Sequence, residues 1–344
     1  MGPSMKDVAA LAGVSPRTVS NVVSGAVPVA PATRARVEEA LRALRYRPNA
    51  AARSLRRGRS GLVALVVPEV DSPYFGEIAA LLSAAAEERG WTLLIEQTSG
   101  DRERERHLLD GVRAQLVDGV VFSPWSLRGE DLAHRRDTAP LVLLGERVGD
   151  GVADHVVVDN VAAAAGATAH LLALGRRRVA AVGARSRVGE DTARLRLDGY
   201  RSALAAAGVD HDPRLELPVD ALHRADGAAA ARRLLAGGPP VDALFCFTDQ
   251  LALGALRVLH EHGLRVPEDV AVVGFDDVED GRYATPSLTT VAPDKRALVR
   301  EAVRCLAERI DVRDGEDPGP RSVVVGHRLV VRETTAGRAG APPA

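Results

Sequence analysis

The sequence predicts a small all-α domain at the N-terminus, followed by a much larger α/β region built on parallel sheets. Helical periodicity and capping signals fill residues 5–46. From residue 61 onward, short apolar runs alternate with stretches of helix length, which is the pattern of a doubly wound α/β fold. The chain has 344 residues, of which 46% are hydrophobic, so both parts can bury a core.

The charge of the chain is divided unevenly between these two parts. Residues 1–60 contain eleven Lys and Arg against three acids, a net charge of +8, whereas the remainder carries −9. A basic N-terminal part followed by an acidic remainder is typical of a DNA-binding module joined to a part that does not bind DNA. A solvated basic tail would be equally positive, but it would lack the helix periodicity and caps of these residues.

The composition argues against a secreted or membrane-spanning protein. The longest apolar runs, such as Leu62–Pro68, have the length of a strand, not the roughly 20 residues of a membrane span. Cys246 and Cys305 lie in apolar segments with no partner at metal-ligand spacing, so we expect buried free thiols. We therefore expect a cytoplasmic, nucleoid-associated protein without a membrane partner.

Three short helices are expected within residues 5–46. The first four residues precede a second methionine, Met5, and are left out of the expected fold. The expected core stripes are Val8, Leu11 and Ala12 in the first helix, Val19, Val22 and Val23 in the second, and Val37, Ala40, Leu41 and Leu44 in the third. The second helix follows a turn at Gly13 and starts with Ser15 as its N-cap and Pro16 at its first position.

The outward face of the second helix is polar. A helix, a glycine-containing turn and a second helix with polar residues outward form a helix-turn-helix, whose second helix enters the major groove of DNA. Arg17 can donate two hydrogen bonds to guanine, and Asn21 can pair bidentately with adenine. The expected DNA-binding residues of this helix are Ser15, Pro16, Arg17, Thr18, Ser20 and Asn21. A three-helix protein-interaction module is the alternative interpretation.

Residues 47–60 have an unusual composition for a linker. Asn49 can cap a helix of about seven residues, which is shorter than the roughly 12–15 residues that are stable alone in water. Such a segment orders only when packed, and its basic residues favour DNA as the partner. Leu55 then has the chemistry of a wedge in the minor groove, although a leucine packed on the next domain is an equal alternative. The expected contacts are Asn49, Ala52, Arg53 and Leu55.

These motifs together resemble the signature of the LacI/GalR repressor family, and the resemblance continues through almost the whole chain. It is carried by Lys6-Asp7-Val8-Ala9, Ala12-Gly13-Val14-Ser15, Thr18-Val19-Ser20, Tyr46-Arg47-Pro48-Asn49 and Ala52-Arg53-Ser54-Leu55. It implies that residues 47–60 form a hinge helix whose Leu55 inserts at the centre of a palindromic operator, where a flexible base step lowers the cost. Asn21 departs from the Arg or His of many members, so the operator sequence does not carry over.

Nine strands are expected after residue 61, with helices between most of them. The strands are Leu62–Pro68, Trp91–Thr98, Val117–Ser123, Leu141–Glu146, His155–Asp159, Arg178–Gly183, Ala243–Thr248, Val270–Phe275 and Leu288–Val291. The helices include Gly76–Arg89, Val161–Leu174, Thr192–Ala207, Gly227–Leu235 and Gln250–His262. The family resemblance implies a periplasmic-binding-protein-like clamshell of two doubly wound parallel-sheet subdomains.

The expected domains are a helix-turn-helix domain at 5–46, a hinge at 47–60, an effector-binding and dimerisation domain at 61–335 and a flexible tail at 336–344. The larger domain is expected to split near 160–163 and again near 290–294. No dinucleotide fingerprint, phosphate-binding loop, nucleophile elbow or zinc-protease motif occurs, and the nine His residues have no metal-ligand spacing. We therefore expect no enzyme, no cofactor and no metal, although the fold alone does not exclude an enzyme.

Ligands of open α/β sheets bind at the carboxyl ends of strands. A guanidinium and a carboxylate facing one cleft can hold vicinal hydroxyls, and aromatic faces cover a sugar ring. The resemblance implies effector contacts at Arg196 and Asp276, and more loosely at Tyr74, Phe75, Trp125, Thr192, Leu222 and Thr248. A surface salt bridge is the alternative for Arg196, and core packing is the alternative for Phe75 and Trp125.

Two departures leave the effector class open. Gly145-Glu146 stands where well-known members have an Asp, and Leu222 stands where a ring often stacks on the ligand. A sugar is favoured, and a purine or other corepressor is the alternative. A palindromic operator requires a two-fold dimer, and the Gly/Ala/Pro-rich end after Thr334 lacks the leucine heptads of a tetramerising helix. The partners expected are operator DNA, a small-molecule effector and a second copy of the chain; a solute-binding protein is the remaining alternative.

Overall fold

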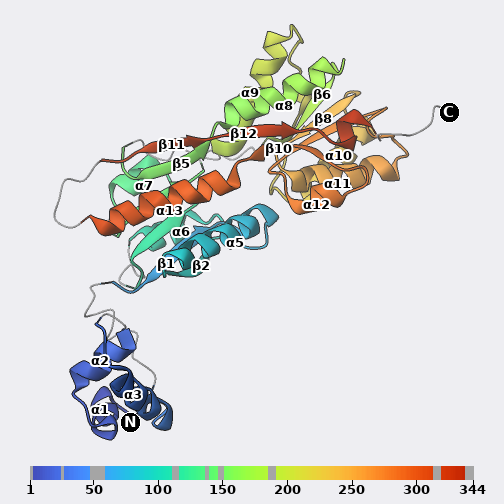
Figure 1. The fold of residues 1–344 in the computed structure, drawn as a ribbon. Helices are drawn as coiled ribbons and strands as arrows, with labels where there is room; N and C mark the ends of the chain where they lie inside the picture. The colour runs from blue at the N-terminus through green and yellow to red at the C-terminus, as the bar shows by residue number, and fades with distance from the viewer. Residues whose placement is uncertain are drawn as a thin grey trace. The chain divides into compact units, whose positions relative to one another are not determined.

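The structure is a computed structural model that describes residues 3–24, 27–46, 59–110, 116–135, 139–145, 151–184, 191–312 and 319–337. The chain divides into two compact units, Met1–Gly61 and Leu62–Ala344 (Figure 1). The predicted contacts Asn49, Ala52, Arg53 and Leu55 lie outside the described residues, as does Glu146. Within the described part of the chain, no helix is long and apolar enough to cross a membrane.

The first unit consists of three helices: α1 (Met5–Ala12), α2 (Pro16–Ser24) and α3 (Pro31–Ala43). Its core contains Val8, Ala9 and Ala12 of α1, Val19 and Val22 of α2, and Val37 and Ala40 of α3. Each helix was predicted, and each amphipathic stripe meets the other two. The three-helix arrangement is therefore a direct product of the local apolar periodicity.

Two details of α1 differ from the prediction. Leu11 is 57% exposed, and Ala9 takes its place in the core. On a helix, residues 8, 9 and 12 share one face, whereas residue 11 lies more than 100° from its centre. Ser4, which was left out of the expected fold, caps the helix: its hydroxyl accepts from Asp7 N, and Asp7 accepts from Ser4 N at 2.7 Å. This capping box makes Ser4 part of the domain.

The second unit contains two six-stranded sheets. The first sheet has the order β11-β5-β4-β3-β1-β2, and the second has the order β12-β10-β9-β8-β6-β7. The strands of the first sheet are β1 (Leu62–Val67), β2 (Thr92–Gln97), β3 (Gly119–Phe122), β4 (Leu141–Leu144), β5 (Asp154–Val158) and β11 (Ser322–Val325). Those of the second are β6 (Val179–Ala184), β7 (Glu216–Pro218), β8 (Ala243–Cys246), β9 (Ala271–Phe275), β10 (Thr289–Pro293) and β12 (His327–Val330).

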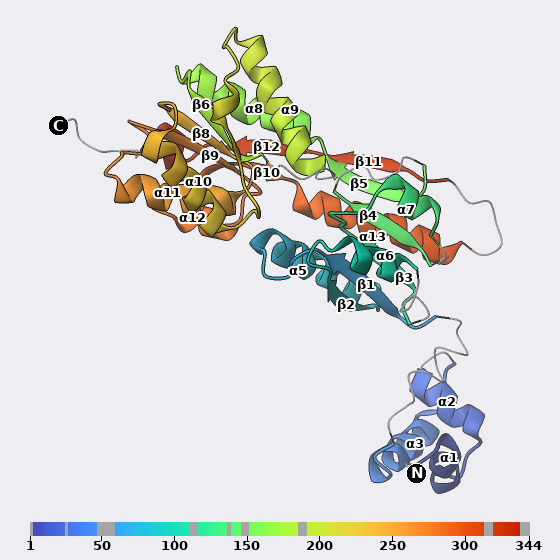
Figure 2. The same ribbon diagram turned by 180° about the vertical axis from the view of Figure 1, so that it is seen from behind.

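All nine predicted strands are present, with ends that are shorter or longer than predicted by no more than two residues, and β7, β11 and β12 were not predicted. Neighbouring strands are parallel except for β10 and β12, which pair antiparallel. The chain crosses between the sheets after β5, after β10 and again between β11 and β12. These crossings join the two sheets by three segments, and both views show β11 and β12 running from one sheet to the other (Figures 1 and 2).

Helices cover the sheets. The longer ones are α5 (Pro73–Glu88), α6 (Arg102–Leu109), α8 (Asn160–Ala173), α9 (Asp191–Ala206), α10 (Arg224–Gly237), α11 (Asp249–Glu261) and α13 (Lys295–Asp311). Short helices are α7 (Gly129–Ala133), α12 (Glu279–Tyr283), α14 (Glu333–Ala336) and the 3₁₀ turn η1 (Pro213–Leu215). In the first sheet, Leu65 packs into the cluster under α5 and α13, whereas its neighbour Val66 packs into the cluster under α6 and α7. The alternation of side chains along a strand thus supplies both cores.

The second sheet is covered by the helix pairs α8–α9 and α10–α11, which share one large core with the sheet (Figure 2). Glycines allow these pairs to approach closely. A Cβ at Gly227 or Gly254 would collide with a main-chain carbonyl of the facing helix. Cys246 and Cys305 are buried and free, as predicted.

Candidate DNA-binding helix and effector cavity

The local sequence fixes how α2 begins. The hydroxyl of Ser15 accepts a hydrogen bond from Thr18 N at 3.1 Å, which confirms Ser15 as the N-cap, and Pro16 is the first helical residue. The Ser15 and Thr18 hydroxyls also lie 2.9 Å apart. Because Val19 and Val22 are buried, the opposite side of the helix faces outward.

The six residues predicted in α2 and its cap are at the surface or partly exposed. Ser15, Pro16 and Arg17 are exposed, and Thr18, Ser20 and Asn21 are partly exposed. The chain thus presents a guanidinium, an amide and hydroxyls from one short helix. This set of donors and acceptors can read base edges and contact phosphates.

One cavity lies between the two sheets of the second unit. All eight effector contacts predicted from the sequence line it: Tyr74, Phe75, Trp125, Thr192, Arg196, Leu222, Thr248 and Asp276. Tyr74 and Phe75 follow β1, Trp125 follows β3, Thr248 follows β8 and Asp276 follows β9. The parallel strands point their carboxyl ends at one gap, which brings together residues up to about 200 positions apart in the sequence.

Arg196 on α9 is held by several partners. Its Nε donates to Asn160 Oδ1 at 2.8 Å, its Nη1 donates to the Phe247 carbonyl, and its Nη2 lies 3.8 Å from Asp276 Oδ1. The guanidinium carbon lies 3.5 Å from the centre of the Phe275 ring. Arg196 is only 8% exposed, so a surface salt bridge is not the right description of it. The guanidinium is fixed at the wall of the cavity.

Asp276 is the carboxylate beside this guanidinium. Its φ of +111° is unusual for a residue other than glycine and turns the chain sharply after β9. Burial raises the pKa of Asp276 to about 6, against the opposing effect of Arg196 and Lys295. The strained backbone and the buried charge together indicate a site held in place by the surrounding fold.

Asp249 is a second buried carboxylate near Asp276. It accepts from the Thr290 hydroxyl at 2.6 Å and from Val278 N at 2.9 Å. Burial, with the charge of Asp276 as the next cause, raises the pKa of Asp249 well above its ordinary value. Asp249 is the first residue of α11 and follows Thr248, whose hydroxyl caps the helix and donates to the Leu222 carbonyl at 3.3 Å. Two cavity residues, Thr248 and Leu222, are therefore tied together.

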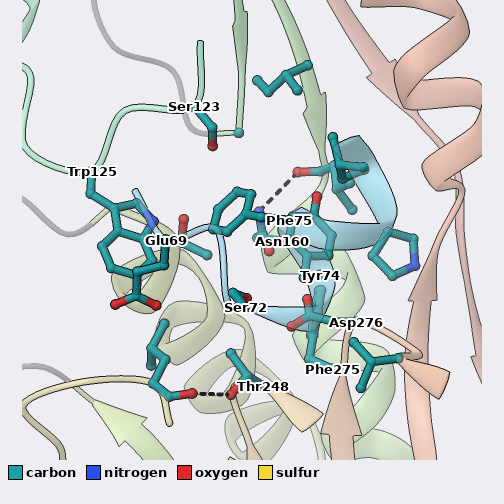
Figure 3. Close-up of a pocket in the computed structure, with 18 of the residues that line it drawn as sticks. Glu69, Ser72, Tyr74, Phe75, Ser123, Trp125, Asn160, Thr248, Phe275 and Asp276 are labelled. Carbon is teal, nitrogen blue, oxygen red and sulfur yellow. Dashed lines mark hydrogen bonds between the residues drawn. The ribbon is translucent and has the colours of Figure 1, made fainter. Parts of the chain in front are cut away.

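Aromatic rings form another wall of the cavity (Figure 3). The ring centres of Tyr74 and Phe75 are 5.2 Å apart in an edge-to-face arrangement, and those of Phe75 and Trp125 are 6.3 Å apart. Phe75 also belongs to the core under α5, so it both packs and lines the cavity. Polar groups on one side and ring faces on another suit a ligand with hydroxyl groups on an apolar ring.

Sequence reasoning missed other polar groups of the cavity. They are Glu69, Ser72, Ser123, Asn160 and Gln250. Ser123 directly follows β3, and Asn160 comes two residues after β5, so the strand-end rule that selected Trp125 could have found them. Gly145, whose φ is +93°, also lines the cavity. It belongs to the Gly145-Glu146 pair that stands where well-known family members have an Asp. Among the described residues, no group of three or more His, Cys, Asp or Glu could hold a metal ion.

Comparison with known proteins identifies the family. The profile of bacterial regulatory proteins, lacI family, matches residues 4–49, and that of a periplasmic binding protein-like domain matches residues 168–335. The HTH-type transcriptional regulator CelR of Thermobifida fusca is 39% identical over 343 residues, covering 96% of this chain and 98% of the relative. The chain belongs to the LacI family.

Solved structures of LacI-family regulators agree with this assignment. A complex of the transcriptional regulator CelR with cellobiose is 37% identical, with a TM-score of 0.70, and covers 96% of this chain and 99% of that one. A lac repressor dimer bound to operator and the anti-inducer ONPF is 28% identical, with a TM-score of 0.81, covering 97% and 99%. This LacI-family chain therefore has the helix-turn-helix and two-subdomain periplasmic-binding-like fold of a transcriptional regulator; the relatives compared are regulators, not enzymes.

Proposed function

We propose that this regulator is a repressor that binds a palindromic operator as a homodimer. A sugar bound in the cavity changes its affinity for that operator. The observation that carries the effector part is the fixed Arg196 guanidinium beside the Asp276 carboxylate, in a cavity that the rings of Phe75 and Trp125 also line. A carboxylate accepts hydrogen bonds from hydroxyls, and a guanidinium donates hydrogen bonds to them. Ring faces cover the C–H surfaces of a ligand.

Disaccharides are the sugar class that we favour. The CelR structure that covers almost this whole chain is a complex with cellobiose. The remaining cavity residues in the proposed effector set are Tyr74, Thr192, Leu222 and Thr248. Because aromatic side chains also stack on planar rings, a purine-like corepressor is the second candidate.

For DNA, we propose that α2 enters the major groove. Arg17 and Asn21 would read bases, and Ser15, Pro16, Thr18 and Ser20 would position the helix on phosphates. The exposure of these residues supports the assignment. Asn49, Ala52, Arg53 and Leu55 would extend the contact into the minor groove as a hinge that orders on DNA.

A second copy of the chain completes the proposed unit, because a palindrome presents two equivalent half-sites. β2 is an edge strand of the first sheet, and its Leu94 and Ile95 are 42% and 48% exposed. Such an apolar edge favours coverage by another protein surface. The coupling would then run from closure of the cavity to the spacing of the two hinge segments. Light scattering should give about twice the 36.3 kDa chain mass and no tetramer.

The test is operator binding with and without a sugar. Fluorescence anisotropy at about 150 mM salt should show a duplex from the chain's own upstream region bound at least ~1,000-fold more tightly than a shuffled duplex. Adding cellobiose should change that affinity and leave shuffled DNA unaffected. Equal affinity for both duplexes, whatever metabolite is added, would refute the proposal that the chain recognises an operator. If cellobiose alone leaves the operator affinity unchanged, only the proposal that cellobiose is the effector fails.

A further inference from the structure

A buried carboxylate holds the loop that carries the cavity residue Trp125. Glu105 of α6 is fully buried, and its two carboxylate oxygens accept hydrogen bonds from consecutive main-chain N–H groups. Oε1 accepts from Trp125 N at 2.9 Å, and Oε2 accepts from Ser126 N at 2.9 Å. Successive N–H groups that converge in this way form a binding site for an anion. Here the anion is a side chain of the protein itself.

The same carboxylate is connected to the loop between β2 and α6. The Thr98 hydroxyl donates to Glu105 Oε1 at 3.3 Å and accepts from Gly100 N at 3.2 Å. The Ser126 hydroxyl donates to the Gly100 carbonyl at 2.6 Å, which joins the two loops a second time. Burial raises the pKa of Glu105, and its hydrogen bonds with the main chain of Trp125 and Ser126 oppose that rise. These bonds therefore compensate part of the cost of burying the carboxylate.

The ring of Trp125 is packed on Gly100 of the same network. Gly100 has a φ of +64°, and a Cβ added there would lie 3.1 Å from Trp125 Cε3. Any other residue at this position would strain the backbone and press on the ring. The hydrogen bonds to Glu105 thus fix the main chain of Trp125, and the close contact with Gly100 fixes its ring.

Trp125 and the charged groups occupy different parts of the cavity wall. Figure 3 shows Trp125 and Asp276 on different sides of the cavity, with Phe75 drawn between them. Arg196 lies 3.8 Å from Asp276, whereas the ring centre of Trp125 lies 6.3 Å from that of Phe75. A ligand of two sugar rings can therefore present one ring to the charged pair and the other to the indole.

We propose that Glu105 is a positioning residue for the effector, whose carboxylate holds the main chain of Trp125 so that the indole covers the second ring of a bound disaccharide. Glu105 does not itself line the cavity, so it acts through the loop that it holds. The proposal deepens the proposed function and rests on it for the identity of the ligand. The arrangement of the loop, by contrast, can be tested without any ligand.

The first experiment measures the fluorescence of Trp125 in the full chain. The chain has two tryptophans, so Trp91→Phe leaves Trp125 as the sole source of tryptophan emission. In that background, Glu105→Gln replaces one acceptor oxygen with an amide group that only donates, and it should release the loop. The emission should shift to longer wavelength and its quenching by acrylamide should increase, because water reaches the ring. Unchanged emission and quenching in folded Glu105→Gln would overturn the proposal.

Two further variants complete this experiment. Glu103→Gln is the matched control, because Glu103 is an exposed acid of the same helix; it should leave the emission of Trp125 unchanged. Thr98→Val is a milder variant that removes one donor to Glu105 and keeps the carboxylate; it should give a smaller shift in the same direction. If circular dichroism shows that Glu105→Gln does not fold, Thr98→Val decides the question, and no shift in its emission would overturn the proposal.

The second experiment measures cellobiose affinity by calorimetric titration. Glu105→Gln should weaken binding about two- to tenfold, which is the range expected for the loss of one aromatic ring contact. In a Trp125→Ala background the same substitution should have no further effect, because the ring that it positions is absent. Equal losses with and without Trp125 would indicate a purely structural role and would overturn the proposal. If cellobiose does not bind the starting chain, the sugar assignment fails, and the emission of Trp125 still decides whether Glu105 positions the ring.

Discussion

The DNA-binding helix and the effector cavity are built in opposite ways. α2 depends on residues within ten positions: Ser15 caps it, Val19 and Val22 anchor it, and its polar groups face outward. The cavity buries Arg196 and Asp276, which lie 80 positions apart in the chain on α9 and directly after β9, and loops of the first sheet complete its wall. The helix is therefore specified locally, whereas the cavity is specified by topology.

This difference has an energetic consequence. The side chains of α2 that are proposed to touch DNA are solvated, so substituting them leaves no buried group without a partner. Arg196 and Asp276 line the cavity, and these two residues and Asp249 are each more than nine-tenths buried, so removing one leaves the others desolvated. Substitutions in α2 should thus act on DNA affinity, and substitutions in the cavity should act on both ligand binding and folding.

The largest effect is expected for Arg196→Ala. It removes the hydrogen bond to Asn160 and leaves Asp276 buried without its guanidinium, at a cost of about 3–5 kcal/mol in the free energy of unfolding. Effector binding should fall below detection in a titration with cellobiose. Operator affinity of the folded fraction should persist.

Arg194→Ala is the matched control for that variant. Arg194 lies on the same helix, is 60% exposed and pairs with Asp198 at 3.4 Å. Its loss should cost no more than about 0.5 kcal/mol and leave ligand binding intact. Equal effects of the two variants on stability and ligand binding would mean that the buried Arg196 contributes no more than an exposed arginine of α9.

The pH dependence of unfolding tests the buried carboxylates. Because burial raises the pKa of Asp276 to about 6, the folded state favours its neutral form. Its contribution to stability is full below about pH 4 and is lost as the pH rises through 6, by at most about 3 kcal/mol. Asp276→Asn should flatten this decline, and the remaining slope should come from Asp249, whose pKa is also raised.

Urea titrations followed by tryptophan fluorescence can measure this slope. Trp91 and Trp125 are the two tryptophans of the chain, and both belong to the second unit. Their emission therefore reports unfolding of the unit that holds the cavity. Parallel stability curves for Asp276→Asn and the starting chain between pH 4.5 and 7.5 would contradict the assigned pKa shift.

In α2, Arg17→Ala should weaken operator binding by about 1–3 kcal/mol, or roughly 5- to 150-fold, and relax the base preference at one position. The stability of the chain should not change, since Arg17 is exposed. Arg34→Ala serves as the comparison, because Arg34 is a partly exposed residue of α3 whose Nη1 lies 4.0 Å from Glu38 Oε1. Binding of a panel of single-base operator variants would separate lost base reading from lost charge, which weakens all sequences alike.

The same contrast explains what the sequence could predict. Ser15, Val19 and Val22 were identified because caps and apolar periodicity are local signals. Leu11 was misplaced because three apolar residues at i, i+3 and i+4 fit two neighbouring faces, and only packing against α2 and α3 selects Ala9. β11 and β12 were missed because they are short runs whose pairing with β5 and β10 is made by distant segments.

The cavity shows this limit most clearly. Arg196 and Asp276 came from the resemblance, since no spacing in the sequence connects α9 to the end of β9. Asn160 and Glu69 follow strand ends, but so do many loop residues, and only the closed fold shows that they face the same space. In the sequence, Asp249 is an acidic residue at the start of a helix, which is common. Its burial against Thr290 of β10 is visible only in the folded structure.

The smallest effect tests whether capping and DNA contact can be separated in α2. Ser15→Ala removes the acceptor of Thr18 N and should cost about 1 kcal/mol of stability in the first unit. Ser15→Asn keeps an acceptor at the cap and should restore that stability. If operator affinity follows stability in both variants, Ser15 acts as a cap alone. If Ser15→Asn folds normally but binds operator several-fold more weakly, its hydroxyl also contacts DNA, and the local and the functional roles of this residue coincide.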